Sequence, residues 1–208
     1  MSSPTTPASI GPGEFFPVVG VGPHEKPWPE GEQYDPELLL NGDRRNVLDH
    51  YRYWTVEAIV KDLNTKRHKL QIAIENWQHD LNIGSIVRTA NAFNVSGVHI
   101  VGKRDWNKRG AMVTDRYLTV MHHPTIQDFA DYCKEQNLPI IGIDNVPGSK
   151  QLEPAVLPES CVLLFGQEGA GMSDEGIAVC EVLYEINQYG STRSMNASAA
   201  GAIAMYHW

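Results

Sequence analysis

The chain has 208 residues, 42% of them hydrophobic, and a formal net charge of −8. This length and composition fit one globular domain with an extension, and the sequence has neither an 18-residue apolar run nor a signal-type N-terminus, so a cytosolic location without membrane contact is expected. The three cysteines, Cys133, Cys161 and Cys180, lack the spacing of metal ligands, which predicts free thiols and no metal site.

The first 68 residues are predicted to form an extension in two parts. Residues 1–36 hold 8 of the 13 prolines, and because this composition buries too little apolar surface to fold alone, a flexible arm is expected. Residues 37–68 are expected to form a basic helical extension. Within it, apolar residues recur mostly at helical spacing over 45–64, which predicts an amphipathic helix with a break near Trp54.

Residues 69–208 are predicted to form the main domain, because short apolar segments alternate with segments of helical periodicity. The apolar segments predict strands at 70–76, 97–102, 139–144, 161–166 and 182–187. The periodic segments predict helices at 82–93, 125–136, 173–180 and 196–208. This alternation is typical of an α/β domain with a mostly parallel sheet and helices on both faces.

The first candidate site is the start of the helix that follows the first strand, at residues 79–84. Asn82 suits the N-cap of this helix, and Arg88 follows in its second turn. A guanidinium at such a place can hold a phosphate or a carboxylate through two hydrogen bonds. An internal salt bridge is the alternative interpretation of Arg88.

The second candidate site is the glycine-bearing segment 166–173. Its glycines permit close approach of a ligand, but their spacing is not that of a dinucleotide-binding loop. Glu168, Asp174 and Glu175 would repel a pyrophosphate. The segment therefore suits a cofactor without phosphate groups, or it is simply a tight turn.

The third candidate site is segment 190–196, which precedes a helix that begins with small residues. Small residues let another backbone approach closely, while Ser194 and Asn196 place a hydroxyl and an amide beside the start of the helix. Ordinary capping of a helix packed in the core is the alternative.

The three segments, in this order, resemble the motifs of the SpoU (TrmH-like) branch of the SPOUT RNA methyltransferases. The matching strings are NIGSIVRTANAF (82–93), LLFGQEGAGMS (163–173) and INQYGSTRSMNASAAGAIAMY (186–206). The resemblance extends from about residue 70 to the end of the chain, and three motifs at family-like separations are far more specific than any one of them.

The resemblance implies an α/β fold whose C-terminal segment is threaded into a trefoil knot, preceded here by an N-terminal extension. It implies that S-adenosylmethionine binds in the knot and that two copies of the chain form a homodimer in which both complete each site. The implied reaction is transfer of a methyl group to a ribose 2′-hydroxyl of tRNA or rRNA.

The resemblance also implies roles for individual residues. The cofactor-binding positions are Leu164, Gly166, Gly171, Ile186 and Met195. The catalytic positions are Asn82, Arg88, Glu168, Ser194 and Asn196. Because a guanidinium stays charged at any ordinary pH, we expect Arg88 to hold a phosphate and stabilise a developing alkoxide rather than to act as a base. Glu168 is expected to orient Arg88 or the glycine-bearing loop.

RNA binding is expected from the basic part of the chain. Residues 44–116 hold 13 of the 17 Lys and Arg but only 7 of the 25 Asp and Glu. Within this part, four cations surround an aromatic ring, a combination that can pair with phosphates and stack on a base. These residues are Lys103, Arg104, Trp106, Lys108 and Arg109. A solvated loop, or a solvated helix face for the whole segment, is the alternative.

Three functions are consistent with the sequence. The first is an RNA ribose methyltransferase, and the second is an RNA-binding or assembly factor that keeps the fold without activity. Retention of all five polar motif residues favours the first over the second. The third is an unrelated nucleotide-dependent α/β enzyme, such as an oxidoreductase, but a glycine fingerprint after the first strand is missing.

Overall fold

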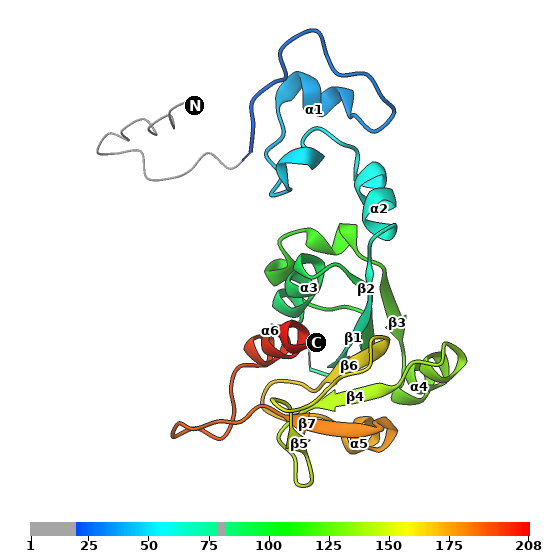
Figure 1. The fold of residues 1–208 in the computed structure, drawn as a ribbon, viewed down its shortest axis with the longest axis vertical. Coiled ribbons are helices and arrows are strands. Elements are labelled where there is room, and N and C mark those ends of the chain that lie inside the picture. The colour runs from blue at the N-terminus through cyan, green and yellow to red at the C-terminus, as the bar shows by residue number, and fades with distance from the viewer. Residues whose placement is uncertain (1–19, 79–81) are drawn as a thin grey trace. The chain divides into compact units, whose positions relative to one another are not determined.

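The computed structural model describes residues 20–78 and 82–208, and the chain divides into two units (Figure 1). The first unit is Met1–Ile59 and the second is Val60–Trp208, so the boundary lies within helix α2 (Val56–Asn64). In the described part of the chain, none of the helices has the length and apolar character needed to cross a membrane.

The first unit is organised around the buried carboxylate of Asp43. It accepts hydrogen bonds from Nε and NH2 of Arg45 at 2.8 and 2.7 Å, and from the backbone N–H of Tyr53 at 3.0 Å. Burial alone would raise the pKa of Asp43, but these hydrogen bonds lower it to about 2. Around this centre lie helix α1 (Pro36–Asn41) and the 3-10 helix η1 (Asp49–Tyr51).

This arrangement differs from the extension predicted by the sequence. Residues 20–36 do not stand apart as an arm, because single β-bridges pair Val21 with Asp43 and Tyr34 with Trp54. The helix predicted from residue 45 begins only at Val56. The residues before it are drawn into hydrogen bonds with Asp43, which compete with helix formation.

The second unit contains a seven-stranded sheet in which every pair of neighbouring strands is parallel, in the order β3-β2-β1-β6-β4-β7-β5. The strands are β1 (His68–Asn76), β2 (Val95–Gly102), β3 (Val120–His123), β4 (Ile140–Ile143), β5 (Lys150–Gln151), β6 (Cys161–Phe165) and β7 (Val182–Glu185). The predicted α/β class with a parallel sheet is confirmed. β3 and β5 were not predicted.

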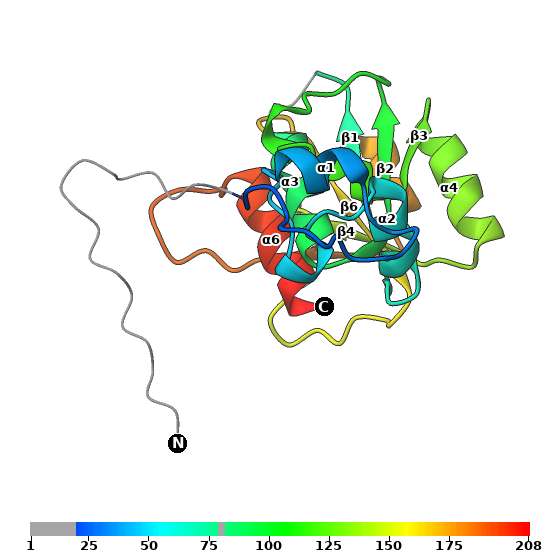
Figure 2. The same cartoon turned by 90° about the horizontal axis from the view of Figure 1, so that it is seen from above.

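Helices cover both faces of this sheet (Figure 2). One face carries α3 (Asn82–Ala92) and α6 (Ala197–His207), and the other carries α4 (Ile126–Glu135) and α5 (Asp174–Val179). The 3-10 helices η2 (Arg109–Ala111) and η3 (Thr114–Tyr117) pack on α3. Because side chains alternate along a strand, Ile72 packs toward α3 whereas its neighbour Ala73 packs toward α4.

A buried histidine pair lies between the sheet and α4. Nδ1 of His99 is 2.8 Å from Nε2 of His123, and Nε2 of His99 is 2.7 Å from Oε1 of Gln71. The rings of Phe129 and Tyr132 pack against both histidines. Burial lowers the pKa of His99 to about 3 and lowers the pKa of His123 as well.

The buried pair predicts that acid destabilises the fold. Unfolded His99 takes up a proton near pH 6.5, whereas the folded protein keeps this side chain neutral down to about pH 3. Its contribution to the free energy of unfolding is therefore complete above pH 6.5 and should fall by about 2 kcal/mol between pH 7.5 and pH 5. Urea denaturation at the two pH values measures this loss. His99→Gln should reduce the loss by that amount, and an unchanged pH dependence in this variant would contradict the assignment.

Candidate active site

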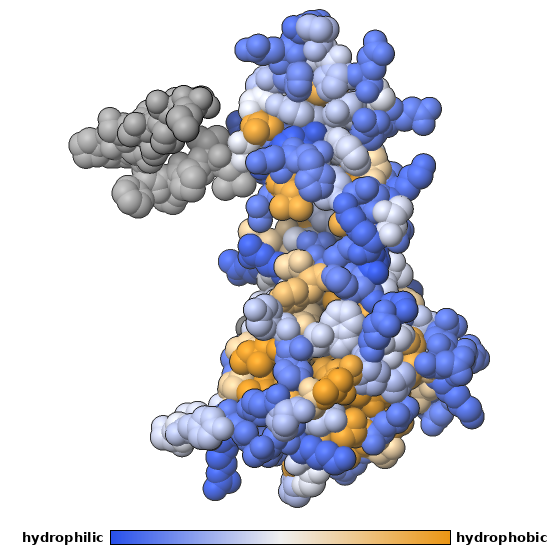
Figure 3. All heavy atoms as spheres, viewed as in Figure 1, coloured by the Kyte–Doolittle hydropathy of each residue, from blue (hydrophilic) through white to orange (hydrophobic). Residues whose placement is uncertain are grey.

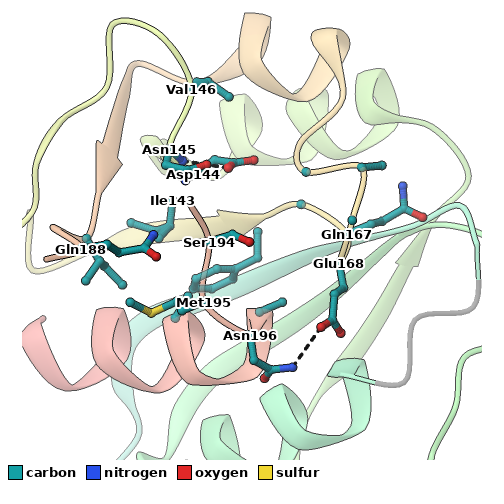
Figure 4. A pocket seen from close by; sticks show the side chains of 18 residues that line it. Ile143, Asp144, Asn145, Val146, Gln167, Glu168, Gln188, Ser194, Met195 and Asn196 are labelled. Carbon is teal, nitrogen blue, oxygen red and sulfur yellow. Dashed lines mark hydrogen bonds between the residues drawn. The ribbon is translucent and has the colours of Figure 1, made fainter. Parts of the chain in front are cut away.

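A cavity of about 410 Å³ opens at the carboxyl ends of β4, β6 and β7 (Figure 4). Its volume lies in the range of small-molecule sites, and this edge of a parallel sheet is where ligands of α/β proteins bind. The cavity is lined by residues 143–146, 165–171, 186, 188, 194–197 and 200.

The segment after β6 folds back on itself to form one wall of the cavity. Gln167 and Gly171 exchange backbone hydrogen bonds of 3.0 and 2.9 Å, and the backbone N–H of Met172 donates to Oδ2 of Asp144 at 2.7 Å. A Cβ atom on Gly166 would lie 2.2 Å from the backbone nitrogen of Met172, so only glycine permits this turn. The predicted glycine-bearing loop is therefore closed and held against the end of β4.

A polar cluster joins three distant segments at the cavity. The amide of Asn82 donates to Oε2 of Glu168. The amide of Asn196 donates to Oδ1 of Asn82 at 2.8 Å and to Oε1 of Glu168 at 3.3 Å, the latter drawn in Figure 4. Oδ1 of Asn196 meanwhile accepts from the backbone N–H groups of Ser198 and Ala199, which caps α6. The first, second and third motifs thus meet through side-chain hydrogen bonds.

Most predicted site residues of the second and third motifs line the cavity. They are Gly166, Glu168, Gly171, Ile186, Ser194, Met195 and Asn196. Leu164 does not line it: this side chain is fully buried within β6 and packs toward α4, because it lies on the opposite face of the sheet from α3 and α6. Asn82 is the first residue of α3 rather than the residue before it, and it reaches the cavity through Glu168 and Asn196. The rest of the predicted helix start, His79 to Leu81, lies outside the described residues.

Arg88 lies away from the cavity in the single chain. Its side chain is exposed, and no hydrogen bond or ion pair of Arg88 occurs within residues 20–78 and 82–208. At roughly 100° per residue, Arg88 points about 120° away from Asn82 around the axis of α3. In agreement with this angle, Arg88 is not among the residues that line the cavity of its own chain. Within the described residues, Arg88 forms neither the internal salt bridge that was the alternative interpretation nor the expected contact with Glu168.

The predicted RNA-binding loop presents its cations to solvent, namely Lys103, Arg104, Lys108 and Arg109. Trp106 is only partly exposed, since its ring packs against the core and Nζ of Lys108 lies 5.4 Å from the ring centroid. Lys108 also pairs with Asp115 at 3.2 Å. Within the described residues, Lys103, Arg104 and Arg109 form no ion pair and can meet phosphates, whereas Lys108 is already paired and the tryptophan ring is not open on both faces for stacking.

The end of β1 ties this loop to the wall of the cavity. Nδ2 of the fully buried Asn76 donates to the carbonyl oxygens of Lys103 and Asp105 at 2.8 and 2.9 Å. The next residue, Trp77, donates its backbone N–H to Oε1 of Gln167 at 3.0 Å. Two adjacent residues therefore set the position of the basic loop relative to the glycine-bearing loop.

Four lining residues lie outside the three motif strings, namely Ile143, Asp144, Asn145 and Val146, and Gln188 lies within the third string but was not singled out. The amides of Asn145 and Gln188 both donate to the carbonyl oxygen of Arg193, which holds the loop before α6 at the rim of the cavity. Asp144 is the last residue of the predicted strand 139–144 and directly follows β4 in the structure. Because ligands of parallel sheets bind at that edge, this position was a usable signal.

The charges at the cavity fit a cofactor without phosphates. Among the described lining residues there is no Lys or Arg, while Asp144 and Glu168 contribute carboxylates. A sulfonium or ammonium group is complemented by these charges, and Ile143, Ile186 and Met195 offer apolar contact to a flat ring. Within the part of the chain that the structure describes, no group of three or more His, Cys, Asp or Glu could hold a metal ion.

Known proteins with similar sequences are RNA methyltransferases. Residues 69–206 match the model of the SpoU rRNA Methylase family. A tRNA (guanosine(18)-2′-O)-methyltransferase of Borreliella burgdorferi is 26% identical over 151 residues, covering 71% of this chain and 69% of that protein. The enzyme of the same name from Escherichia coli is 28% identical over 154 residues, covering 71% of this chain and 66% of its own length.

A solved structure has the same fold. The SpoU methyltransferase AviRb from Streptomyces viridochromogenes, in complex with the cofactor AdoMet, aligns with a TM-score of 0.62 and 23% identity. The alignment covers 70% of this chain and 62% of AviRb, so this chain spans less than two thirds of that relative. Together with the match over residues 69–206, these findings show that the chain belongs to the SpoU rRNA methylase family.

Proposed function

We propose that this chain transfers a methyl group from S-adenosylmethionine to a ribose 2′-hydroxyl in tRNA or rRNA. The observation that carries the proposal is the hydrogen-bonded cluster of Asn82, Glu168 and Asn196 at the cavity. Three motifs that are separate in the sequence meet there, at the edge of the sheet where a cofactor would bind. The names of the relatives support the class of reaction. The location in the cytosol stays a prediction.

The cavity residues are proposed to bind and orient the cofactor. Bound S-adenosylmethionine would supply an electrophilic methyl group. The closed loop from Gly166 to Gly171 offers backbone groups, Ile186 and Met195 offer apolar contact, and Asp144 and Glu168 offer negative charge. Because the loop and the carboxylates of Asp144 and Glu168 are already held by hydrogen bonds, little ordering of these groups is required on binding.

Arg88 is proposed to act on the ribose and its neighbouring phosphate. A guanidinium can hold a phosphate bidentately and stabilise negative charge that develops on the 2′-oxygen. In one chain Arg88 is exposed and does not line the cavity, so the proposed role assigns Arg88 to the site of a second copy. The need for a second copy supports the homodimer that the resemblance implies.

The surface of α6 supports the same dimer. Its sequence, ASAAGAIAMYH, is apolar on nearly all sides, and Gly201, Ala204 and Met205 are buried against the rest of the unit. Its other side leaves Ile203 43% and Tyr206 81% exposed, and hydrophobic side chains reach the surface in this region (Figure 3). A helix that is apolar all round is normally buried all round, and a second copy would cover this one.

Ile203→Glu is expected to convert a dimer into monomers, because a charge would be placed in the apolar contact. Light scattering coupled to size exclusion measures the mass directly. Val156→Glu is the matched control, since Val156 is 94% exposed on the loop after β5 and should tolerate the charge. A wild-type monomer, or an Ile203→Glu variant that remains dimeric, would contradict the proposed interface.

RNA capture is proposed to use the basic loop 103–109. Its cations are exposed, and the end of β1 fixes the loop beside the wall of the cavity. Phosphates held by this loop would therefore lie near the cofactor. Phosphate contacts of this kind position an RNA without reading its sequence.

The test of the function uses labelled methyl donor and separated unmodified RNAs from cells that lack the gene. We expect label in one class of RNA and a 2′-O-methyl nucleotide after digestion. Binding of S-adenosylmethionine and RNA without any transfer would favour the inactive RNA-binding or assembly factor instead. Binding of NAD in place of S-adenosylmethionine would favour an unrelated nucleotide-dependent enzyme.

A further inference from the structure

A loop at the rim of the cavity carries an almost fully exposed aromatic ring. Residues 186–196 connect β7 to α6 without regular secondary structure, and Tyr189 within them is 92% exposed. Isolated exposed aromatic residues are common on protein surfaces, so exposure alone assigns nothing. What distinguishes Tyr189 is the way in which its loop is attached to the cavity.

Both ends of this loop are held at the cavity. Gln188 on one side and Ser194 on the other line the cavity, and both are labelled in Figure 4. The carbonyl oxygen of Arg193 accepts hydrogen bonds from the side chains of Asn145 and Gln188. The five residues between these ends, 189–193, therefore project from a fixed base directly beside the cavity.

The projecting side chains are not used within the chain. In the two described stretches, no hydrogen bond, ion pair or ring contact involves the side chain of Tyr189, Ser191, Thr192 or Arg193, and all four residues are exposed. A Cβ atom on Gly190 would meet nothing within 4 Å. Packing and folding do not explain why an aromatic ring and a guanidinium stand here.

RNA offers a partner for each of these two side chains: an unpaired base for the ring of Tyr189 and a phosphate for the guanidinium of Arg193. Single-stranded RNA is recognised by stacking of unpaired bases on aromatic rings and by pairing of Arg with phosphates. The other aromatic candidate, Trp106, is partly buried and covered by Lys108, so it cannot present a free face in the same way. Tyr189 presents its ring freely, next to the place where the reacting ribose must lie.

We infer that Tyr189 stacks on an unpaired base of the substrate RNA, at or next to the methylated nucleotide, and that Arg193 contacts an adjacent phosphate. This inference rests on the proposed function and adds a substrate property to it. The target nucleotide is unpaired when it is bound, and the loop before α6 is a positioning element for it.

The test compares Tyr189→Ala, Tyr189→Phe and Arg193→Gln with the wild type, and Val156→Ala serves as a control of equal exposure on another loop. The probes are unmodified tRNA and rRNA from cells that lack the gene. The readouts are the dissociation constant for RNA by filter binding, the KM for RNA, and the dissociation constant for S-adenosylmethionine. RNA binding is measured without turnover, so this test stands even if no transfer is found.

Loss of the ring should weaken RNA binding and raise KM by about 5- to 100-fold in Tyr189→Ala, since stacking on an aromatic ring has this magnitude. Tyr189→Phe should stay within about twofold of the wild type, because the ring and not the hydroxyl is used. Arg193→Gln should lower the dependence of RNA binding on salt by roughly one phosphate contact. Val156→Ala should change nothing.

Three results would overturn the inference. The first is that Tyr189→Ala binds RNA as tightly as the wild type does. A wild type that binds neither tRNA nor rRNA counts as the same result. The second is an equal loss of affinity for S-adenosylmethionine, which would make Tyr189 a cover of the cofactor. The third is a lower molecular mass of Tyr189→Ala in light scattering, which would place the ring in a contact between two copies. If the variants change RNA binding as expected but no methyl transfer is detected, the result contradicts only the proposed function.

Discussion

Arg88→Ala is expected to reduce methyl transfer at least about 100-fold while affinity for S-adenosylmethionine stays within a few fold. The reason is geometric: Arg88 is exposed on α3 and does not line the cavity of its own chain, so its removal leaves the cofactor contacts unchanged. Single-turnover transfer to RNA and calorimetric titration of S-adenosylmethionine measure the two effects. Arg88→Lys should recover little of the activity, because an ammonium cannot form the bidentate contact.

Mixing two defective variants tests whether Arg88 acts on the other copy. Ala200→Phe would place a ring in the cavity that Ala200 lines and so block the cofactor. In mixed dimers of Arg88→Ala and Ala200→Phe, one of the two sites then contains an open cavity together with an intact Arg88. We expect mixing to restore about one quarter of the wild-type activity. No restoration in demonstrably mixed dimers would place Arg88 at the cavity of its own chain.

The main sheet was predictable because its central strands are short, apolar and bounded by turns. The segments 70–76, 97–102 and 161–166 correspond to β1, β2 and β6, which are largely buried on both faces and therefore consist mostly of apolar residues. The edge strands gave no such signal. β3 contains two histidines among its four residues, and β5 consists of an exposed lysine and glutamine. Their pairing is decided by neighbouring strands rather than by their own sequence.

The predicted helix over 45–64 shows how a local pattern can be overridden. Apolar residues recur there at helical spacing, yet only the part from Val56 is helical. A single buried carboxylate, Asp43, takes the hydrogen bonds of Arg45 and Tyr53, and the chain between them bends around it. Periodicity cannot reveal such a centre, because it depends on one polar residue outside the periodic segment.

The candidate site was predicted where motifs are local and missed where it depends on folding. Gly166, Glu168 and Asn196 stand in recognisable strings and line the cavity as expected. Asp144 and Asn145 lie outside these strings and reach the same cavity only because β4 lies beside β6 in the sheet. The order of the strands, and with it the neighbours of each loop, was not part of the sequence pattern. The trefoil knot stays a prediction.

Asn76→Asp is expected to destabilise the folded protein by about 3 kcal/mol at pH 8. Nδ2 of Asn76 donates to two carbonyl oxygens, and the residue is fully buried. The substitution replaces this donor with a carboxylate that faces both oxygens. Because burial against two carbonyl oxygens raises the pKa of the introduced carboxyl above its unfolded value, the loss should shrink as the pH falls toward 4. Urea denaturation of variant and wild type over this pH range measures the difference.

Asn76→Ala separates the lost hydrogen bonds from the introduced charge. It should cost about 2 kcal/mol, with the same pH dependence as the wild type, because two carbonyl oxygens lose their partner but no ionisable group is added. Both variants should also weaken RNA binding more than cofactor binding, since Asn76 holds the carbonyl oxygens of Lys103 and Asp105 whereas the hydrogen bond to Gln167 comes from the backbone of Trp77. Equal stability of Asn76→Asp and the wild type at pH 8 would mean that the end of β1 does not hold the basic loop in place.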